Sequence, residues 1–185
     1  MLLASPTSRY EGRPSAGPLP ATAEEVHPSI QVRANLGIVG DRYFGKPAHR
    51  NASVTLMAAE ALEAVRVDLG LTDPLDPVAT RRNILLAGVD IDSMRGATIS
   101  LDTGDGPVLF QLNRPANPCA WMDVVLAPGA FRALRGRGGM RAEPLSDGML
   151  RLGPALLRSS LPLDPVHPAP LQRLLGSVTA PGGSA

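Results

Sequence analysis

The sequence predicts a mainly β fold: a closed or partly closed β-barrel with a few peripheral α-helices. The 185 residues include 19 glycines and 19 prolines, about a fifth of the chain and above the usual share of roughly 12%, which favours many turns. Apolar residues alternate along many short segments with the period of two that marks half-buried strands. Only two or three segments show helical periodicity. Many short strands with few helices indicate a barrel with helices on its outside.

The length of the chain allows one domain of ordinary size with its own core. We expect that domain to span residues 28–158. Residues 1–27 and 159–185 are rich in Pro, Ser, Ala and Gly and show little periodicity. We therefore expect a flexible N-terminal segment and a flexible C-terminal tail, both poorly ordered or loosely docked.

Eight segments of the expected domain show strand patterns. Apolar residues alternate at Ile30 and Val32, along 97–101 and along 108–112, as in strands with one buried face. The other predicted strands are 54–56, 84–86, 140–145, 149–152 and 155–157.

Three segments are predicted to be helical. The clearest runs from residue 58 to 69, where apolar residues recur at spacings of four, three and four and so share one face. A second covers 120–126 and is stopped by Pro128 and Gly129, and a third covers 130–134.

Charge and composition exclude several classes of protein. With 18 basic and 17 acidic residues the net charge is +1, so no nucleic-acid partner is expected. No apolar run approaches the roughly 18–20 residues that span a bilayer, and the first ten residues do not form a secretory signal. One cysteine allows no internal disulfide. We therefore expect a cytoplasmic protein without a membrane partner.

Signatures of common enzymes are missing from the sequence. The three histidines are far apart, and neither HExxH nor CxxC spacing indicates zinc. There is no GxSxG elbow, Walker A loop or dinucleotide-binding fingerprint.

The single cysteine, Cys119, follows Asn117 and Pro118 directly before the second predicted helix. Pro118 restricts the backbone there, and the positive end of a helix macrodipole favours a thiolate, which is a nucleophile and a ligand for soft metals. The alternative is a small buried apolar residue, as free cysteines often are. The sequence leaves both interpretations open.

Arg81, Arg82 and Asn83 stand directly before a predicted strand. Two guanidinium groups and an amide at a sheet edge or barrel mouth suit an anionic ligand with phosphate. The alternative is a solvated strand entry with salt bridges to Asp76 or Asp90.

Two loops are further candidates for a site. In the loop 136–139, amides freed by Gly138 and Gly139 could form an anion nest, but we favour a helix C-cap and turn. The polar loop 40–50 carries Asp41, Arg42 and His49. Loops with such a mixture are often functional, although a structural turn is equally defensible.

Taken in order, these segments resemble the MOSC family, the molybdenum-cofactor-sulfurase C-terminal-type domains, and in particular small stand-alone bacterial members. The resemblance covers about residues 28–158. It is carried by Gly40-Asp41-Arg42, Val54-Thr55-Leu56 leading to Glu60, Arg81-Arg82-Asn83-Ile84, Gly88-Val89-Asp90, Pro118-Cys119, 129–134, Gly138-Gly139-Met140-Arg141-Ala142 and 148–153.

The resemblance implies a β-barrel domain like those of molybdenum-cofactor sulfurases, mitochondrial amidoxime-reducing components and small bacterial proteins that protect against N-hydroxylated bases. In several of these the family cysteine ligates molybdenum. That role would fall to Cys119 as metal ligand and catalytic residue, and Arg82 and Asn83 would hold the pterin or its phosphate. Further cofactor candidates are Arg81, Arg114, Asn117, Gly138 and Gly139, with Asp41, Arg42 and His49 in the wider site.

The function implied by the resemblance is a molybdenum-cofactor-dependent oxidoreductase that reduces an N-hydroxylated or N-oxidised small molecule and takes electrons from a separate donor protein. Sulfur transfer through a Cys119 persulfide is a second expectation. A non-catalytic cofactor carrier is a third. Some family members join this domain to a pyridoxal-phosphate-dependent one, but here only Lys46 could form the Schiff base. A lysine in a polar loop is a poor imine former, so we expect no pyridoxal phosphate.

Overall fold

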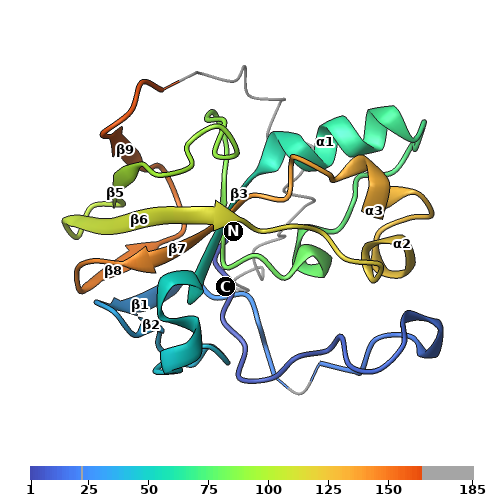
Figure 1. Ribbon diagram of the computed structural model, residues 1–185, viewed down its shortest axis with the longest axis horizontal. Coiled ribbons are helices and arrows are strands. Elements are labelled where there is room, and N and C mark those ends of the chain that lie inside the picture. The colour runs from blue at the N-terminus through green and yellow to red at the C-terminus, as the bar shows by residue number, and fades with distance from the viewer. Residues whose placement is uncertain (22, 164–185) are drawn as a thin grey trace, which may run out of the picture.

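Two β-sheets form one side of the molecule (Figure 1). The computed structural model describes residues 1–21 and 23–163. The strands are β1 (Ser29–Arg33), β2 (Gly37–Ile38), β3 (Val54–Ala58), β4 (Ile84–Leu86), β5 (Thr98–Asp102), β6 (Pro107–Pro115), β7 (Met140–Pro144), β8 (Gly148–Arg151) and β9 (Leu156–Ser159). All eight predicted strands are confirmed, and β2 adds a short one that the pattern missed.

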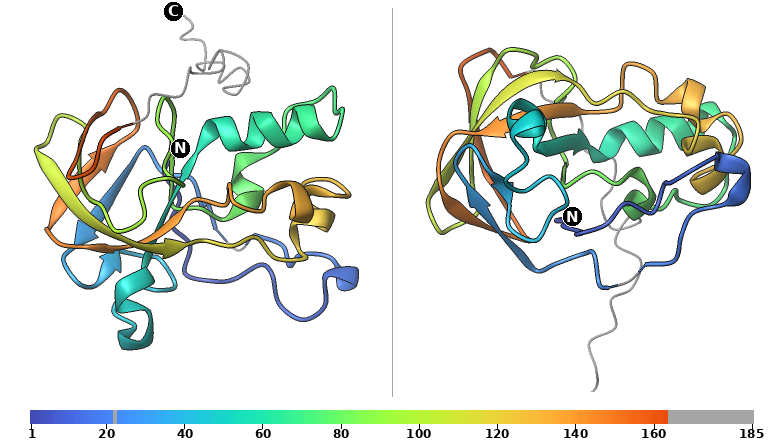
Figure 2. Two further views of the ribbon diagram at one scale, coloured as in Figure 1. Left: turned by 45° about the horizontal axis from the view of Figure 1, so that its top comes forward. Right: turned by 60° about the horizontal axis from the view of Figure 1, so that its bottom comes forward.

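The larger sheet has six strands in the order β4-β3-β7-β6-β5-β9, and the smaller has three in the order β2-β1-β8. All neighbouring strands are antiparallel except β3 and β4, which are parallel. Strands β7 and β8 follow one another in the chain but belong to different sheets, so the chain passes from one sheet to the other. The larger sheet curls around the shared interior into a half-barrel (Figure 2). The predicted mainly β, partly closed architecture is confirmed.

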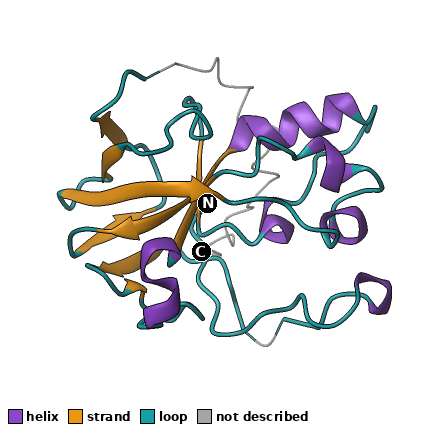
Figure 3. Ribbon diagram, viewed as in Figure 1, coloured by secondary structure: helices purple, strands orange, loops and turns teal. Residues whose placement is uncertain are grey.

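The α-helices gather beside the barrel, whereas the 3-10 helix of residues 47–52 lies against the strands (Figure 3). They are α1 (Ala59–Asp68), α2 (Met122–Val125) and α3 (Ala130–Ala133), with 3-10 helices η1 (Pro14–Ala16), η2 (Pro47–Ala52) and η3 (Pro77–Thr80). Helix α1 buries Leu62 and Val65, as its apolar spacing predicts. The second predicted helix is shorter than expected, because only the single turn α2 forms. Among the described residues, no helix is long and apolar enough to cross a membrane.

The core has two parts. Alternating residues of both sheets fill the barrel, as the period-two pattern predicts; Val32, Leu56, Phe110, Leu112 and Leu150 are all fully buried there. A second cluster packs α1 against α2 and α3. Its members include Leu62, Val65, Trp121, Met122 and Leu134.

The N-terminal segment packs against the barrel, in contrast to the expected loose docking. Leu2 and Leu3 are buried, and they bridge to Ile84 and Val26 respectively. The Leu3 N–H donates to the Asn83 carbonyl at 2.7 Å. The apolar start of the segment completes the core beside β4, a contact that its Pro- and Ser-rich composition does not reveal. Of the expected C-terminal tail, residues 164–185 lie outside the described part of the chain.

Candidate functional site

Cys119 lies in the loop between β6 and α2, and its side chain is exposed. The alternative of a small buried apolar residue is therefore wrong. The Met122 N–H donates to the Cys119 carbonyl at 2.9 Å, which starts the turn of α2. Because α2 has one turn only, few peptide dipoles are aligned behind the thiol, and the expected macrodipole effect is small.

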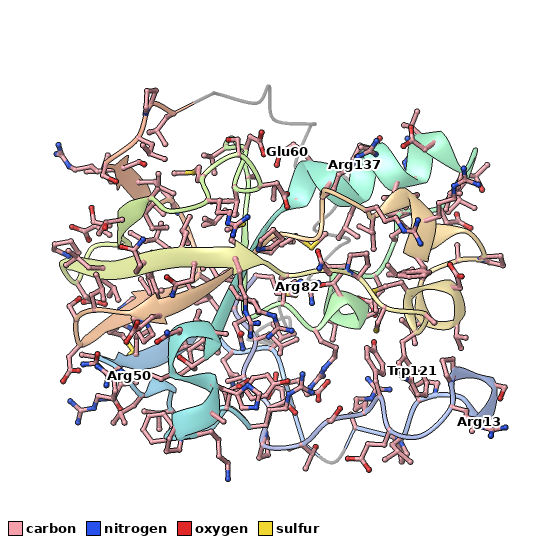
Figure 4. All side chains as sticks on the ribbon, in the orientation of Figure 1. Arg13, Arg50, Glu60, Arg82, Trp121 and Arg137 are labelled. Atoms are coloured by element: carbon pink, nitrogen blue, oxygen red, sulfur yellow. The ribbon has the colours of Figure 1, made fainter. Side chains whose placement is uncertain are left out.

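Arg82 lies near the centre of the molecule, where the barrel meets the helical side (Figure 4). Its guanidinium group donates from Nε to the Gly138 carbonyl at 2.7 Å, from Nη1 to the Thr80 carbonyl at 3.1 Å and from Nη2 to the Ala116 carbonyl at 2.7 Å. The side chain thus joins three segments that are distant in sequence. Its main contacts are structural, whereas the sequence interpretation assigned it to the cofactor.

Burial and several neighbouring charges act on the pKa of Arg82. Burial, and next the positive charge of Arg141, lower the pKa of Arg82 to about 10. Cys119 and Asp92 act in the opposite direction, so both lie close enough to the guanidinium group to interact with its charge. The charges that act on Arg82 therefore include both the loop of the exposed thiol and a second arginine.

The buried amide of Asn83 has no hydrogen-bonding capacity left. Its Oδ1 accepts from the N–H of Thr55 at 3.0 Å and from the Thr55 hydroxyl at 2.8 Å. Its Nδ2 donates to the Leu3 carbonyl at 3.1 Å and to Asp41 Oδ2 at 3.0 Å. An amide has two acceptor and two donor sites, so this side chain ties β3 to the N-terminal segment, and no donor or acceptor remains for a pterin.

Arg81 is also buried, with a left-handed φ of 59°. Its Nη1 lies 2.5 Å from Glu25 Oε2, and its Nη2 donates to the Thr7 carbonyl at 3.2 Å. The partner is thus Glu25, neither Asp76 nor Asp90 as the alternative interpretation proposed. Burial alone would raise the pKa of Glu25, but hydrogen bonds from Arg81 and Ser5 lower it overall. The Nε of Arg81 has no hydrogen-bond partner within the described residues.

The loop after β2 places Asp41 against the N-terminal segment. Asp41 accepts from the N–H groups of Ser5 at 3.4 Å and Tyr43 at 3.0 Å, and burial raises its pKa. The Arg42 guanidinium stacks over the Tyr43 ring at 4.6 Å, and the ring centroids of Tyr43 and His49 are 4.5 Å apart. Asp41 is therefore a structural acceptor, while the half-buried Arg42 beside it packs on the Tyr43 ring.

A small open pocket lies next to Arg82. Its polar lining comes from Asp41, Arg42, Tyr43, Thr55, Arg81, Arg82, Asn83 and Arg141. Of its four arginines, Arg42 and Arg141 make no ion pair or hydrogen bond with a side chain of the described residues, whereas Arg81 and Arg82 are engaged. The pocket therefore offers two uncommitted guanidinium groups to an anion.

Arg141 was not predicted as a site residue, although the strand pattern contained a signal for it. Met140 and Ala142 are buried in β7, so Arg141 between them faces away from the core. It pairs with Thr55 on one side and with Arg114 on the other. Arg114, a predicted cofactor residue, is exposed at the end of β6, as is Asn117 in the loop beyond it.

Gly138 and Gly139 do not form a free anion nest. The Gly139 N–H donates to Asp92 Oδ1 at 2.8 Å, and the Gly139 carbonyl accepts from the Ala116 N–H at 2.7 Å. A Cβ at Gly138 would lie 2.3 Å from the Ala116 oxygen. The pair is thus a point at which three segments approach closely, and the turn that follows helix α3 lies just before it, at 134–136.

Asp92 is the second residue that the sequence analysis missed. Burial, more than the neighbouring charge of Asp90, raises its pKa. It lies in the loop between β4 and β5, where no motif marks it. No three His, Cys, Asp or Glu residues form a metal-ligand cluster within the described part of the chain. Lys46 is exposed, and the absence of pyridoxal phosphate stays a prediction.

Comparisons with solved structures show the fold. The YuaD protein from Bacillus subtilis superposes with a TM-score of 0.63 at 16% identity, over 75% of this chain and 88% of that one. YiiM from Geobacillus stearothermophilus (TM-score 0.46, 21% identity, 58% and 54% covered) and YiiM from Escherichia coli (0.48, 15%, 80% and 67%) are also similar. No curated protein matches this chain.

A comparison with models of protein families identifies the family of the chain. The model of the MOSC domain matches residues 29–156, which is more than half of the sequence and includes Cys119, Arg82 and strands β1 to β8. The exposed thiol and the four arginines of the pocket all lie within these residues. The chain therefore belongs to the MOSC domain family.

Proposed function

We propose that this protein binds the molybdenum cofactor, with Cys119 as the protein ligand of the metal, and reduces N-hydroxylated or N-oxidised small molecules. One observation carries the proposal: the exposed thiol of Cys119 follows three residues after Ala116, whose carbonyl binds Arg82, and Arg82 lines a pocket with two uncommitted arginines. A soft thiolate suits a molybdenum centre, and guanidinium groups suit the phosphate of a pterin. The residues present therefore fit the group.

Each residue has a separate task in this proposal. When bound, the cofactor would supply two-electron redox chemistry at its metal. The Cys119 sulfur would bind the metal, and Arg42 and Arg141 would bind the anionic part of the cofactor. Arg82 holds the loop before Cys119 through the Ala116 carbonyl. Arg81 and Asn83 keep the pocket wall in place from behind, since their polar groups already bind Glu25, Thr55 and Asp41.

The surroundings of the protein follow from the same proposal. We propose a small-molecule substrate, a cytoplasmic location and a separate protein that donates electrons. The net charge of +1 supports the absence of a nucleic-acid partner, because nonspecific binding to phosphate backbones depends on a basic surface.

The test is metal and pterin content in protein made by a host that synthesises the cofactor. Wild type should carry molybdenum and pterin in near-stoichiometric amounts. Because the Cys119 side chain is exposed, Cys119→Ser should change the free energy of unfolding by less than about 0.5 kcal/mol. It should nevertheless lose at least about tenfold in bound molybdenum, since a neutral hydroxyl does not replace a thiolate ligand. A folded Cys119→Ser protein with full metal content and turnover would refute the proposal.

The arginine pocket is tested in the same assay. The double change of Arg42→Gln and Arg141→Gln should reduce pterin content, because both uncommitted cations are removed. Arg13→Gln and Arg158→Gln together remove the same charge from exposed positions and serve as the control. Equal pterin content in the two double variants would remove the arginines from the proposed site.

Sulfur transfer is the second candidate, because an exposed thiol in a loop held by a guanidinium group also suits a persulfide carrier. Intact mass measurement distinguishes it: a gain of one sulfur atom on Cys119, without metal, favours sulfur transfer. Bound cofactor without turnover of any N-hydroxylated substrate would favour a carrier.

A further inference from the structure

The backbone before Cys119 is anchored at Ala116. Its N–H donates to the Gly139 carbonyl at 2.7 Å, and its carbonyl accepts from Arg82 Nη2, also at 2.7 Å. Ala116 is fully buried, whereas Cys119, three residues later, is exposed. The exposed thiol is therefore carried by a short loop whose position depends on a buried anchor.

Ala116 in turn packs against the backbone of Gly138 and Gly139. A Cβ at Gly138 would lie 3.4 Å from Pro118 Cδ, so the loop before Cys119 lies directly against this backbone. Arg82 holds one residue of the pair through the Gly138 carbonyl at 2.7 Å. Any shift of Gly138 and Gly139 would move the loop of Cys119 with it.

Asp92 holds the other residue of the pair. Its Oδ1 accepts from the Gly139 N–H at 2.8 Å. Asp92 is itself fixed, because its N–H donates to Asp90 Oδ1 at 3.0 Å within the loop between β4 and β5. A continuous path of hydrogen bonds thus runs from Asp92 through Gly139 to Ala116.

We propose that Asp92 is a positioning residue for Cys119: it acts through Gly139 and Ala116 to hold the thiol-bearing loop in one orientation. What matters at residue 92 is a side-chain oxygen that accepts from Gly139, since a buried N–H without an acceptor is unfavourable. The role concerns the orientation of Cys119 alone, so it holds whichever ligand Cys119 binds.

The test uses a nitroxide spin label on Cys119, which is the only cysteine of the chain and needs no background substitutions. The electron paramagnetic resonance line shape then reports how freely this loop moves on the nanosecond timescale. Asp92→Ala removes the acceptor and should shorten the rotational correlation time of the label about twofold or more. Asp92→Asn keeps a side-chain oxygen and should resemble wild type.

Asp147→Ala is the matched control. Asp147 also accepts from a backbone N–H, that of Ala34 at 2.7 Å, but it lies in the loop between β7 and β8. This loop leaves the end of β7 that pairs with Phe110, whereas the loop of Cys119 follows the opposite end of β6. This variant should leave the spectrum of the label unchanged. If it mobilises the label as much as Asp92→Ala does, general loosening is the cause and the proposal fails.

Two further outcomes would overturn the proposal. One is a folded Asp92→Ala protein with the wild-type line shape, and the other is an Asp92→Asn protein as mobile as Asp92→Ala, which would assign the effect to charge. If Asp92→Ala does not fold, Asp92→Glu takes its place, because its carboxylate is displaced by one methylene. The label in this variant should show intermediate mobility, and a spectrum identical to that of wild type would contradict the proposal. The label is read without cofactor, so failure to bind molybdenum does not affect the result.

Discussion

At the scale of single residues, Arg82 illustrates how a cation can serve a site without binding its ligand. Three of its five N–H donors are used by backbone carbonyls, and one of these carbonyls belongs to the loop of Cys119. Arg42 and Arg141, by contrast, carry the same charge without an ion pair or a side-chain hydrogen bond in the described structure, although Arg42 stacks over the Tyr43 ring. Arg81 and Arg82 thus hold the pocket together, whereas Arg42 and Arg141 remain available to bind an anion in it.

Arg82→Ala should therefore act on stability first. Hydrogen bonds from a charged donor contribute about 1.5–3 kcal/mol each, and the three are not additive, so we expect the free energy of unfolding to fall by about 3 kcal/mol or more. Urea denaturation measures this. Arg158→Ala, at an exposed side chain of β9, is the control and should stay within about 0.5 kcal/mol of wild type. A cost below about 1 kcal/mol at Arg82 would contradict the structural role.

At the scale of elements, the close approach of β3, β7 and the loop after β6 depends on Gly139. Its φ is +83°, and an added Cβ would lie 2.0 Å from the Leu56 carbonyl oxygen. Gly136, in the same loop, has a similar φ of +78° but nothing within 4 Å of an added Cβ. A substitution at Gly136 therefore introduces backbone strain alone, whereas the same substitution at Gly139 introduces backbone strain and a steric clash.

Gly136→Ala should cost only the left-handed strain of an L-residue, about 1–2 kcal/mol. Gly139→Ala adds a backbone clash that no side-chain movement relieves, so we expect about 3 kcal/mol or more and a loss of Cys119 positioning. Thermal and urea unfolding of both variants provide the comparison. Equal costs would mean that the close packing around Gly139 contributes nothing.

The ion pair between Glu25 and Arg81 joins the N-terminal segment to the barrel and predicts a pH dependence. The folded pKa of Glu25 lies below its usual value of 4.5, because the hydrogen bonds from Arg81 and Ser5 outweigh burial. A lowered pKa stabilises the fold above pH 4.5, and this contribution disappears as the pH falls through the folded pKa. Burial raises the pKa of Asp41. The contribution of Asp41 to the pH dependence of stability therefore has the opposite sign.

Glu25→Gln should lower stability at neutral pH by about 3–5 kcal/mol, because the buried Arg81 charge loses its partner. The variant should also show a smaller fall in the free energy of unfolding below pH 4.5 than wild type. Glu11→Gln, at an exposed position, is the control and should keep the wild-type pH profile. Parallel profiles for Glu25→Gln and wild type would show that this carboxylate does not contribute.

At the scale of the whole molecule, the first residues of the chain belong to the core. Leu3 is 1% exposed, while Leu19 in the same segment is 47% exposed. Further along, Tyr10 stacks on Trp121 with the ring centroids 5.2 Å apart, so the segment contacts both the barrel and the helical side (Figure 4).

Leu3→Ala should destabilise the protein by about 2–5 kcal/mol, the range for a buried leucine truncated in a packed core. Leu19→Ala should stay within about 0.5 kcal/mol of wild type. Chemical denaturation of the two variants makes the comparison. If Leu3→Ala lowers the free energy of unfolding no more than Leu19→Ala does, the N-terminal segment is only loosely docked, as its composition predicts.

Local sequence patterns determined every described strand except β2, and also helix α1 and the family of this protein. Alternation at Ile30 and Val32, or along 108–112, reports burial of one face directly, and the ordered motifs around Gly40, Arg82 and Cys119 identify a MOSC domain. These features depend on neighbours in the chain. They could therefore be predicted without knowledge of the tertiary contacts.

Only the tertiary structure decided which polar groups of the site are already occupied. Asn83 is saturated by Thr55, Leu3 and Asp41, and Arg81 is paired with Glu25, whereas Arg141 has no such partner among residues 1–21 and 23–163. Nothing in the local pattern separates these residues, because the partners come from segments tens of residues away and are selected by strand register and packing. The physical reason is that a hydrogen bond needs contact within about 3 Å, and the fold alone brings such distant atoms together.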